Sequence, residues 1–166
     1  MKVLNLFSRK KTTEVIYTIV NGKVFDVSEV NDKVFSSKMM GESVAFLPED
    51  DTIVAPCNGK ISIIAGTKHA LWLINEIGME VMIHVGLNTV ELNGEGFEVL
   101  VKVNQEVKMG DPIIRFDKQK FLSKGIDLTS ILAITNSDDY NIAIKELNKK
   151  VNAKESIVMD CSRKEG

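Results

Sequence analysis

The sequence predicts an all-β fold, a compact β-sandwich or barrel-like antiparallel sheet with short helical turns. Short runs of apolar and β-branched residues follow one another along most of the chain, and turn residues bound each run. The dipeptide Asn-Gly, which supplies the positive φ angles of tight turns, occurs at positions 21–22, 58–59 and 93–94. Many short strands at such spacing are typical of sandwiches and barrels.

The expected strands share a content of Val, Ile, Phe and other apolar residues over short runs. In chain order they are residues 15–20, 23–27, 43–47, 52–55, 60–64, 70–74, 79–85, 97–101 and 113–116.

Helix is expected to be minor. Residues 117–124 can form one or two turns, and Ser137 or Asp138 can cap a short helix that runs through Leu147. A faint similarity between residues 19–24 and 55–61, both centred on Asn-Gly-Lys, favours a fold of two related halves.

The length of 166 residues fits one domain with a substantial core. We expect the domain to span residues 15–160, between a flexible basic N-terminal tail at residues 1–14 and a flexible C-terminal tail at residues 161–166. Hydrophobic residues make up 44% and charged residues 27%, which is an ordinary globular balance. The net charge of −2 gives no electrostatic footprint for nucleic acid.

The N-terminal residues Met1–Lys11 form a short basic amphipathic segment. They lack the uninterrupted apolar core of a signal peptide, and no run in the chain approaches the roughly 20 apolar residues that span a bilayer. We therefore expect a cytoplasmic protein. At most, the basic segment makes weak peripheral contact with anionic lipid.

His84 is the most informative residue, because it lies in an apolar, β-branched run that predicts a buried strand. Burial disfavours the charged imidazole, and Gly86 places the ring near the end of that strand. The only other histidine is His69, which precedes the expected strand 70–74. A hairpin closed by residues 75–78 would put both rings at similar distances from its turn, and therefore side by side.

These two histidines leave three interpretations open on composition alone: two core histidines, a metal site, or a catalytic pair. A catalytic zinc usually has three protein ligands, so the metal interpretation needs a carboxylate or a partner. Cys57 and Cys161 cannot form a disulfide framework and show no CxxC spacing. Phosphate-binding glycine loops, the GxSxG elbow and HExxH are absent from the sequence.

Several segments together resemble the glucose-type enzyme IIA of the bacterial phosphoenolpyruvate-dependent sugar phosphotransferase system. They are residues 34–36 with 38–41, residues 54–56 with 58–59, residues 67–70, residues 83–97 and residues 110–117. The resemblance runs from about Val15 to Met159, and the segment around His84 is specific on its own.

The resemblance implies a phosphotransferase component that works through a phosphohistidine intermediate. His84 would accept a phosphoryl group from the histidine-containing phosphocarrier protein and pass it to a cysteine of a sugar-specific enzyme IIB during sugar uptake. His69 would stabilise the phosphoryl oxygens, and Thr67 would orient the His69 ring. No cofactor is implied, and zinc could bridge His69 and His84 only with a carboxylate from a partner.

The resemblance also implies a docking surface for both protein partners. It maps onto Val34, Phe35, Met39, Met40 and Val90, with Trp72 at a matching aromatic position. Methionines are adaptable, so such a surface can fit more than one partner. Asp32 matches an acidic position, whereas Asn88 departs from the aspartate that is usual there. The loss of that charge should weaken electrostatic steering of a basic partner without removing the nucleophile.

Three alternatives compete with this hypothesis. A regulatory binder that senses sugar flux by its phosphorylation state would use the same histidines. A zinc peptidase on a related scaffold would need an HxH pair, and a lipoyl or biotinyl carrier would need a Met-Lys-Met hairpin tip near residues 104–117; the sequence has neither. We expect a free-standing component whose sugar is set by a permease outside this sequence.

Overall fold

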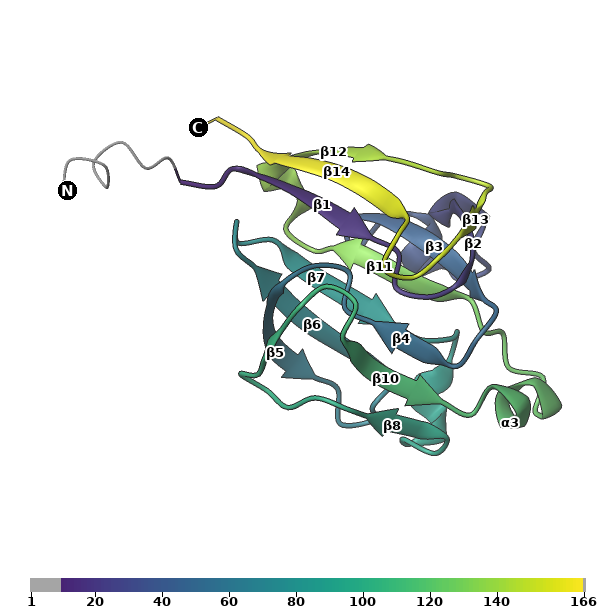
Figure 1. The fold of residues 1–166 in the computed structure, drawn as a ribbon. Helices are drawn as coiled ribbons and strands as arrows, with labels where there is room; N and C mark the ends of the chain where they lie inside the picture. The colour runs from purple at the N-terminus through teal and green to yellow at the C-terminus, as the bar shows by residue number, and fades with distance from the viewer. Residues whose placement is uncertain (1–9, 166) are drawn as a thin grey trace.

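The computed structural model describes residues 10–165 and shows an antiparallel all-β protein, as the sequence predicts. Its strands form one large sheet, in the order β13-β2-β3-β11-β7-β6-β5-β9, and two three-stranded sheets, in the orders β1-β14-β12 and β4-β10-β8. In Figure 1 the two small sheets are seen as separate layers, with β1, β14 and β12 above and β4, β10 and β8 below.

The strands and helices are all short. The strands are β1 (Thr13–Tyr17), β2 (Gly22–Asp26), β3 (Glu42–Pro48), β4 (Thr52–Val54), β5 (Gly59–Ile64), β6 (Ala70–Asn75), β7 (Glu80–His84), β8 (Phe97–Val99), β9 (Glu106–Val107), β10 (Pro112–Phe116), β11 (Ser130–Ile134), β12 (Tyr140–Ile144), β13 (Lys150–Val151) and β14 (Ile157–Arg163). The helical turns are η1 (Val27–Glu29), α2 (Lys33–Ser36), η2 (Thr89–Leu92), α3 (Lys118–Ser123) and η3 (Ser137–Asp139).

The large sheet is covered on both faces, which explains why its central strands are continuously apolar. Along β7, Val81 and Ile83 enter the main hydrophobic core, and Met82 enters a second, smaller core. Successive side chains of a strand point to opposite faces, so His84 shares its face with Met82. His84 therefore lies on the face of the large sheet that carries the smaller core.

The main core joins all three sheets, since it contains Ile16 from β1, Ile53 from β4 and Leu71 from β6. The smaller core is formed by the other face of the large sheet together with η1 and α2, through Val27 and Phe35. This second layer covers the face of the large sheet on which His84 lies.

All nine expected strands are present, with bounds that differ by a few residues, and α3 confirms the expected helical turns at 117–124. The expected helix from Ser137 to Leu147 is wrong. Only η3 is helical there, and Tyr140–Ile144 pairs with β14 instead. The alternation of Ile142 and Ile144 with smaller residues suits this pairing, and tertiary contacts override a weak helix propensity.

The expectation of a flexible C-terminal tail at residues 161–166 is also wrong over its first half. Strand β14 continues to Arg163 between β1 and β12, and Cys161 is buried between them. At the other end, β1 begins at Thr13, inside the expected tail of residues 1–14. The membrane-contact hypothesis for Met1–Lys11 falls almost entirely outside the described residues. No helix within residues 10–165 is long and apolar enough to cross a membrane.

The two similar sequence segments occupy equivalent places and meet each other. Each leads into a strand that begins with glycine, at Gly22 in β2 and Gly59 in β5. The Val54 N–H donates to the Ile19 carbonyl at 2.8 Å, and the Tyr17 N–H donates to the Pro56 carbonyl at 2.9 Å. Both segments therefore precede a strand, and each is hydrogen-bonded to a residue that flanks the other.

Truncation of the chain after Asp160 is expected to lower the free energy of unfolding by about 3 kcal/mol or more. It removes a buried thiol and several ladder hydrogen bonds, each worth about 1 kcal/mol. Urea unfolding measures the loss, and truncation after Lys164, which leaves β14 intact, is the control. Equal midpoints for the two truncations would contradict the ordered C-terminus.

Candidate functional site

His84 is the last residue of β7 and lies between two neighbouring strands. It pairs with Ala70 of β6 on one side and with Ile131 of β11 on the other. His69 immediately precedes β6, and its carbonyl accepts a hydrogen bond from the Val85 N–H at 2.8 Å. The hairpin expected from the sequence thus brings the two histidines to adjacent positions.

The two imidazoles meet edge to face. Their ring centroids are 4.8 Å apart, with an interplanar angle of 83°. The Phe35 ring lies on another side of His84 at the same centroid distance of 4.8 Å and an angle of 61°. Aromatic pairs prefer such geometry, so these contacts hold the His84 ring in one orientation.

The His69 ring is fixed by Thr67, as the resemblance implies for these two residues. Thr67 Oγ1 and His69 Nδ1 are 2.7 Å apart, which is a strong hydrogen-bond distance. If the hydroxyl donates, Nδ1 is the acceptor and Nε2 carries the ring proton. The turn that carries them is tight, because Lys68 between them has a φ of 62°.

The two nitrogens of His84 differ in environment. Nδ1 is buried and has no hydrogen-bond partner in the described part of the chain, whereas Nε2 is not among the buried, unpartnered atoms. The ring therefore presents Nε2 to the surface. In His69, too, Nδ1 is engaged and Nε2 is the nitrogen left for a ligand.

The pKa of His84 is lowered to about 4, mainly by burial and also by the neighbouring His69, while the Gly86 backbone and the Asp32 charge oppose the shift. A backbone group raises an imidazole pKa by accepting a proton from the ring, so the Gly86 contribution is that of a nearby acceptor that falls short of hydrogen-bond geometry. Burial also lowers the pKa of His69. Both rings are therefore neutral at neutral pH.

The loop after β7 is held by Gly86 and by two residues that the sequence analysis did not single out, Thr89 and Ser130. Thr89 Oγ1 donates to the Val85 carbonyl at 2.6 Å, and the Gly86 N–H donates to Ser130 Oγ at 3.3 Å. Gly86 has a φ of 74°, and a Cβ there would stand 2.6 Å from Thr89 Cγ2. Ser130 belongs to β11, a strand that was not predicted, so only Thr89 and Gly86 carried a sequence signal.

The residues proposed for docking differ in accessibility. Val34, Met39 and Val90 are exposed, with 43%, 73% and 50% of their surfaces accessible. Phe35 is buried against His84, and Met40 and Trp72 are half-buried on the smaller core. Trp72 pairs with Met82 and so shares the face of His84. Val34, Met39 and Val90 are therefore accessible to a partner, whereas Phe35 supports the His84 ring more than it faces solvent.

Asp32 and Asn88 have distinct local roles. Asp32 caps α2, because its Oδ1 accepts from the Val34 and Phe35 N–H groups at 2.9 and 3.4 Å. Asn88 is exposed, has a φ of 58°, and makes no capping hydrogen bond with its side chain. Asn and Asp both tolerate this left-handed conformation. An aspartate could therefore stand at position 88 without a change in the backbone.

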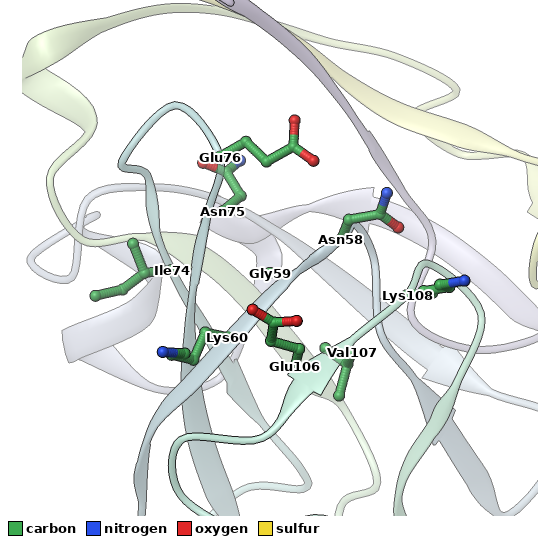
Figure 2. A pocket seen from close by; sticks show the side chains of 9 residues that line it. All are labelled: Asn58, Gly59, Lys60, Ile74, Asn75, Glu76, Glu106, Val107 and Lys108. Atoms are coloured by element: carbon green, nitrogen blue, oxygen red, sulfur yellow. The ribbon is translucent and has the colours of Figure 1, made fainter.

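The described residues hold no group of three or more His, Cys, Asp or Glu side chains that could bind a metal ion. A hollow of about 510 Å³ lies elsewhere, with Lys60, Glu76 and Lys108 among its lining residues (Figure 2). None of the predicted site residues lines it. The histidine pair is therefore separate from this hollow.

The fold and the site define an all-β protein with two neutral, partly buried histidines at the end of a strand hairpin. A family model described as phosphoenolpyruvate-dependent sugar phosphotransferase system, EIIA 1, matches residues 14–140. This chain belongs to that family.

Curated relatives agree with the family. A glucose-specific EIIA component of Staphylococcus epidermidis is 36% identical over 157 residues, which cover 92% of this chain and 95% of the relative. A glucoside-specific EIICBA component of Staphylococcus carnosus is 44% identical over 135 residues, which cover 81% of this chain and 20% of the relative. The chain thus spans about a fifth of such multidomain relatives and nearly all of the shorter one.

The fold also matches a solved structure, glucose permease IIA from Mycoplasma capricolum. The TM-score is 0.83 at 28% identity, with 92% of this chain and 99% of that chain covered. This agreement confirms the predicted fold class.

The low pKa of His84 gives a prediction about acid stability. Between its unfolded value of 6.5 and its folded value of about 4, the unfolded chain binds a proton that the folded protein excludes. The free energy of unfolding is therefore expected to fall by about 3 kcal/mol as the pH drops through this window.

Urea unfolding between pH 7 and pH 4 measures the slope for the wild type and for His84→Gln. Carboxylates contribute alike to both proteins, so the variant should lose less stability on acidification. A direct check is NMR titration of the His84 ring. An ordinary midpoint near 6.5 would contradict the desolvated environment.

Proposed function

We propose that this protein is a phosphoryl carrier of a bacterial sugar phosphotransferase system. It accepts a phosphoryl group on His84 from the histidine-containing phosphocarrier protein and passes it to a cysteine of a sugar-specific enzyme IIB during sugar uptake. The observation that carries the proposal is the neutral His84 ring, with Nδ1 buried and Nε2 facing the surface beside His69.

The transfer exchanges one P–N bond for another. The lone pair of His84 Nε2 attacks phosphorus in line, and the P–N bond to the phosphocarrier's histidine breaks, so that this histidine leaves as a neutral ring. A neutral imidazole is required, and the lowered pKa of His84 keeps it neutral at cytosolic pH. In the second half, a thiolate of enzyme IIB attacks the same phosphorus and His84 leaves.

His69 is the positioning partner in this proposal. With Thr67 donating to its Nδ1, the His69 Nε2–H can donate to a phosphoryl oxygen. A fixed donor is worth most where charge develops during transfer, because it needs no reorganisation at that moment. This assignment predicts separate roles for two adjacent rings, with His84 as nucleophile and His69 as donor.

Both partners must cover the histidine pair in turn. The exposed Val34, Met39 and Val90 provide apolar contacts around it, and Met39 is flexible enough to fit two different surfaces. A sugar permease is a fitting final partner, because relatives carry an EIIA unit together with EIIB and EIIC in one chain. A cytoplasmic location follows from the same proposal.

The proposal is tested by mixing the protein with phosphoenolpyruvate, enzyme I and the histidine phosphocarrier, and measuring intact mass. The wild type should gain one acid-labile phosphoryl group, and His84→Gln should gain none, because the nucleophile is gone. Phosphorylation of His84→Gln at another residue would contradict the assignment.

His69→Gln is the matched control on the neighbouring ring. It should still accept phosphate at His84 and then pass it to enzyme IIB at least about 100-fold more slowly, the scale of one lost transition-state donor. Loss of acceptance itself would contradict the separate roles.

Asn88→Asp is expected to accept phosphate from the phosphocarrier several-fold faster at low salt. The change adds one negative charge to a net charge of −2, at an exposed position that already has a suitable backbone. Steering of a basic partner acts on the association rate and is screened by salt. Stopped-flow transfer rates at low and high ionic strength measure the effect, and a gain that persists undiminished at high salt would argue against steering.

A further inference from the structure

The three Asn-Gly dipeptides of this chain are held in different ways. In any Asn-Gly sequence the main-chain nitrogen of glycine can attack the asparagine side-chain carbonyl, because glycine offers little steric hindrance. The attack needs a free asparagine amide and a glycine nitrogen that can approach it. A hydrogen-bonded side chain or a glycine fixed in a β-ladder prevents this approach.

At positions 21 and 22 the asparagine amide is not free and the glycine nitrogen cannot approach it. Asn21 Oδ1 accepts from the Ala153 N–H at 2.7 Å, and Asn21 Nδ2 donates to Asp50 Oδ2 at 2.7 Å. Gly22 belongs to β2 and pairs with both β3 and β13. Cyclisation there would break the side-chain bonds and the ladder together.

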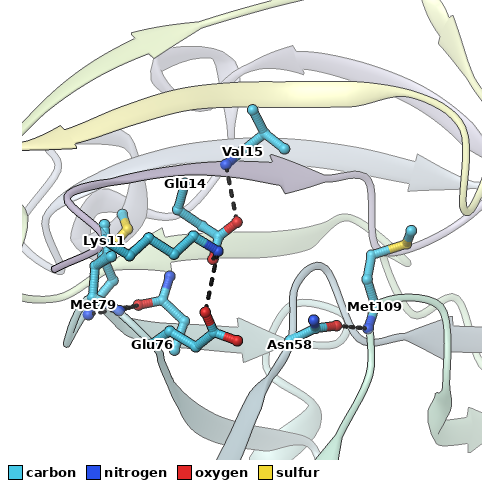
Figure 3. Close-up of polar contacts among 9 residues, drawn as sticks. Lys11, Glu14, Val15, Asn58, Glu76, Met79 and Met109 are labelled. Carbon is cyan, nitrogen blue, oxygen red and sulfur yellow. Dashed lines mark hydrogen bonds and ion pairs between the residues drawn. The ribbon is translucent and has the colours of Figure 1, made fainter. Parts of the chain in front are cut away.

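At positions 58 and 59 the dipeptide is also locked. Asn58 Oδ1 accepts from the Met109 N–H at 2.8 Å, drawn as a dashed line in Figure 3. Gly59 lies in β5 between β6 and β9, where Figure 2 shows it between Ile74 and Val107. A Cβ on Gly59 would stand 2.6 Å from the Ile74 carbonyl oxygen, so this backbone has no room to turn.

Asn93 and Gly94 lack both restraints. Asn93 is exposed at the end of η2, and within residues 10–165 its side chain makes no hydrogen bond. Gly94 lies outside the strands, in a turn where Asn93, Gly94 and Gly96 have φ angles of 51°, 89° and 84°. The Gly94 carbonyl accepts from the Phe97 N–H at 3.1 Å, but its own N–H donates to no acceptor in the same described range.

We propose that Asn93 is a site of spontaneous deamidation, in a turn that lies beside Lys68, the residue before His69. The Gly94 nitrogen loses its proton and bonds to the side-chain carbonyl carbon of Asn93. The bond from that carbon to Nδ2 breaks, and Nδ2 leaves as ammonia with that proton, which closes a succinimide ring. Water then opens the ring at either carbonyl. The product is aspartate or isoaspartate at position 93, and water is the only co-reactant.

The modification adds a carboxylate close to the site, and the isoaspartate form also lengthens the main chain by one methylene. The Lys68 side chain passes beside Gly94, and its stem carbons lie 3.5–3.8 Å from where a Gly94 Cβ would stand. Lys68 directly precedes His69, and the turn at Lys68 is tight. A shift at position 93 is therefore transmitted through Lys68 to His69.

The test incubates the folded protein in mildly alkaline buffer made with heavy-oxygen water and follows the three Asn-Gly peptides by mass spectrometry. Heavy oxygen should enter position 93 at least about tenfold faster than positions 21 and 58, since each of these must first lose several hydrogen bonds. Equal rates at the three positions, or faster labelling at 21 or 58, would overturn the proposal.

Two controls test whether the faster labelling at position 93 comes from the fold or from the Asn-Gly sequence alone. In denaturant the three sites should be labelled at similar rates, because all three share the Asn-Gly chemistry; persistence of the same preference there would overturn the structural explanation. Asn93→Gln, which cannot close the five-membered ring readily, should remain unlabelled at position 93. Labelling of that variant at an undiminished rate would exclude the succinimide route.

NMR of the histidine ring protons measures whether modification at position 93 affects His69. The His69 resonances should move in aged wild-type protein and stay unchanged in aged Asn93→Gln. Unmoved His69 resonances in a sample shown by mass to be modified would overturn the transmission through Lys68. These readouts require no phosphoryl transfer, so they stand independently of the proposed function.

Discussion

The antiparallel pairing of β6 with β7 is the constraint on which the site depends. Its register places His84 opposite Ala70 and leaves His69 one residue beyond the pairing. A strand has a side-chain period of two, so a slip by one residue would turn His84 into the main core and bring Ile83 to the site. The register is fixed because both faces of β7 are buried, in two different cores. The cores therefore determine the chemistry as well as the stability.

The position of His84 is a compromise between burial and access. Full burial would make the ring neutral but unreachable, and full exposure would leave its pKa near 6.5, with a protonated fraction at cytosolic pH. The structure buries Nδ1 and leaves Nε2 accessible, and it surrounds the ring with Phe35 and His69. The buried Nδ1 has no partner in the described chain, which is a cost that a site accepts for function. The Gly86 backbone raises the pKa of the ring, so it can stabilise a proton on Nδ1 when Nε2 is bonded to a phosphoryl group.

The sequence predicted the parts of the fold that depend on local pattern. Strands β6 and β7 were found because their runs are apolar and bounded by turns, and the adjacency of His69 and His84 followed from their distances to one turn. Strand β11 was missed although it is central, because Ser130–Ile134 follows a polar segment without a hairpin signal. Strand β14 was missed because it pairs with β1, which is distant in sequence, and with β12, which the sequence analysis assigned to a helix. The contact of Phe35 with His84 is equally non-local, and only the resemblance suggested that the two residues share a surface.

The loops at the site combine a rigid scaffold with strained turns. Lys68, Gly86, Asn88 and Asn93 all have positive φ angles, and each lies within a few residues of a site histidine or of the exposed Val90. Such turns bring backbone and side chains close to a partner in little space, and residues at functional sites often have this conformation. Two consecutive positive φ angles, at Asn93 and Gly94, are best adopted by asparagine and glycine. Neither residue belongs to a strand, so no ladder hydrogen bonds hold them in place. The turn at Asn93 is therefore chemically reactive, whereas the other two Asn-Gly dipeptides have the same sequence, lead directly into strands β2 and β5, and are protected by their hydrogen bonds.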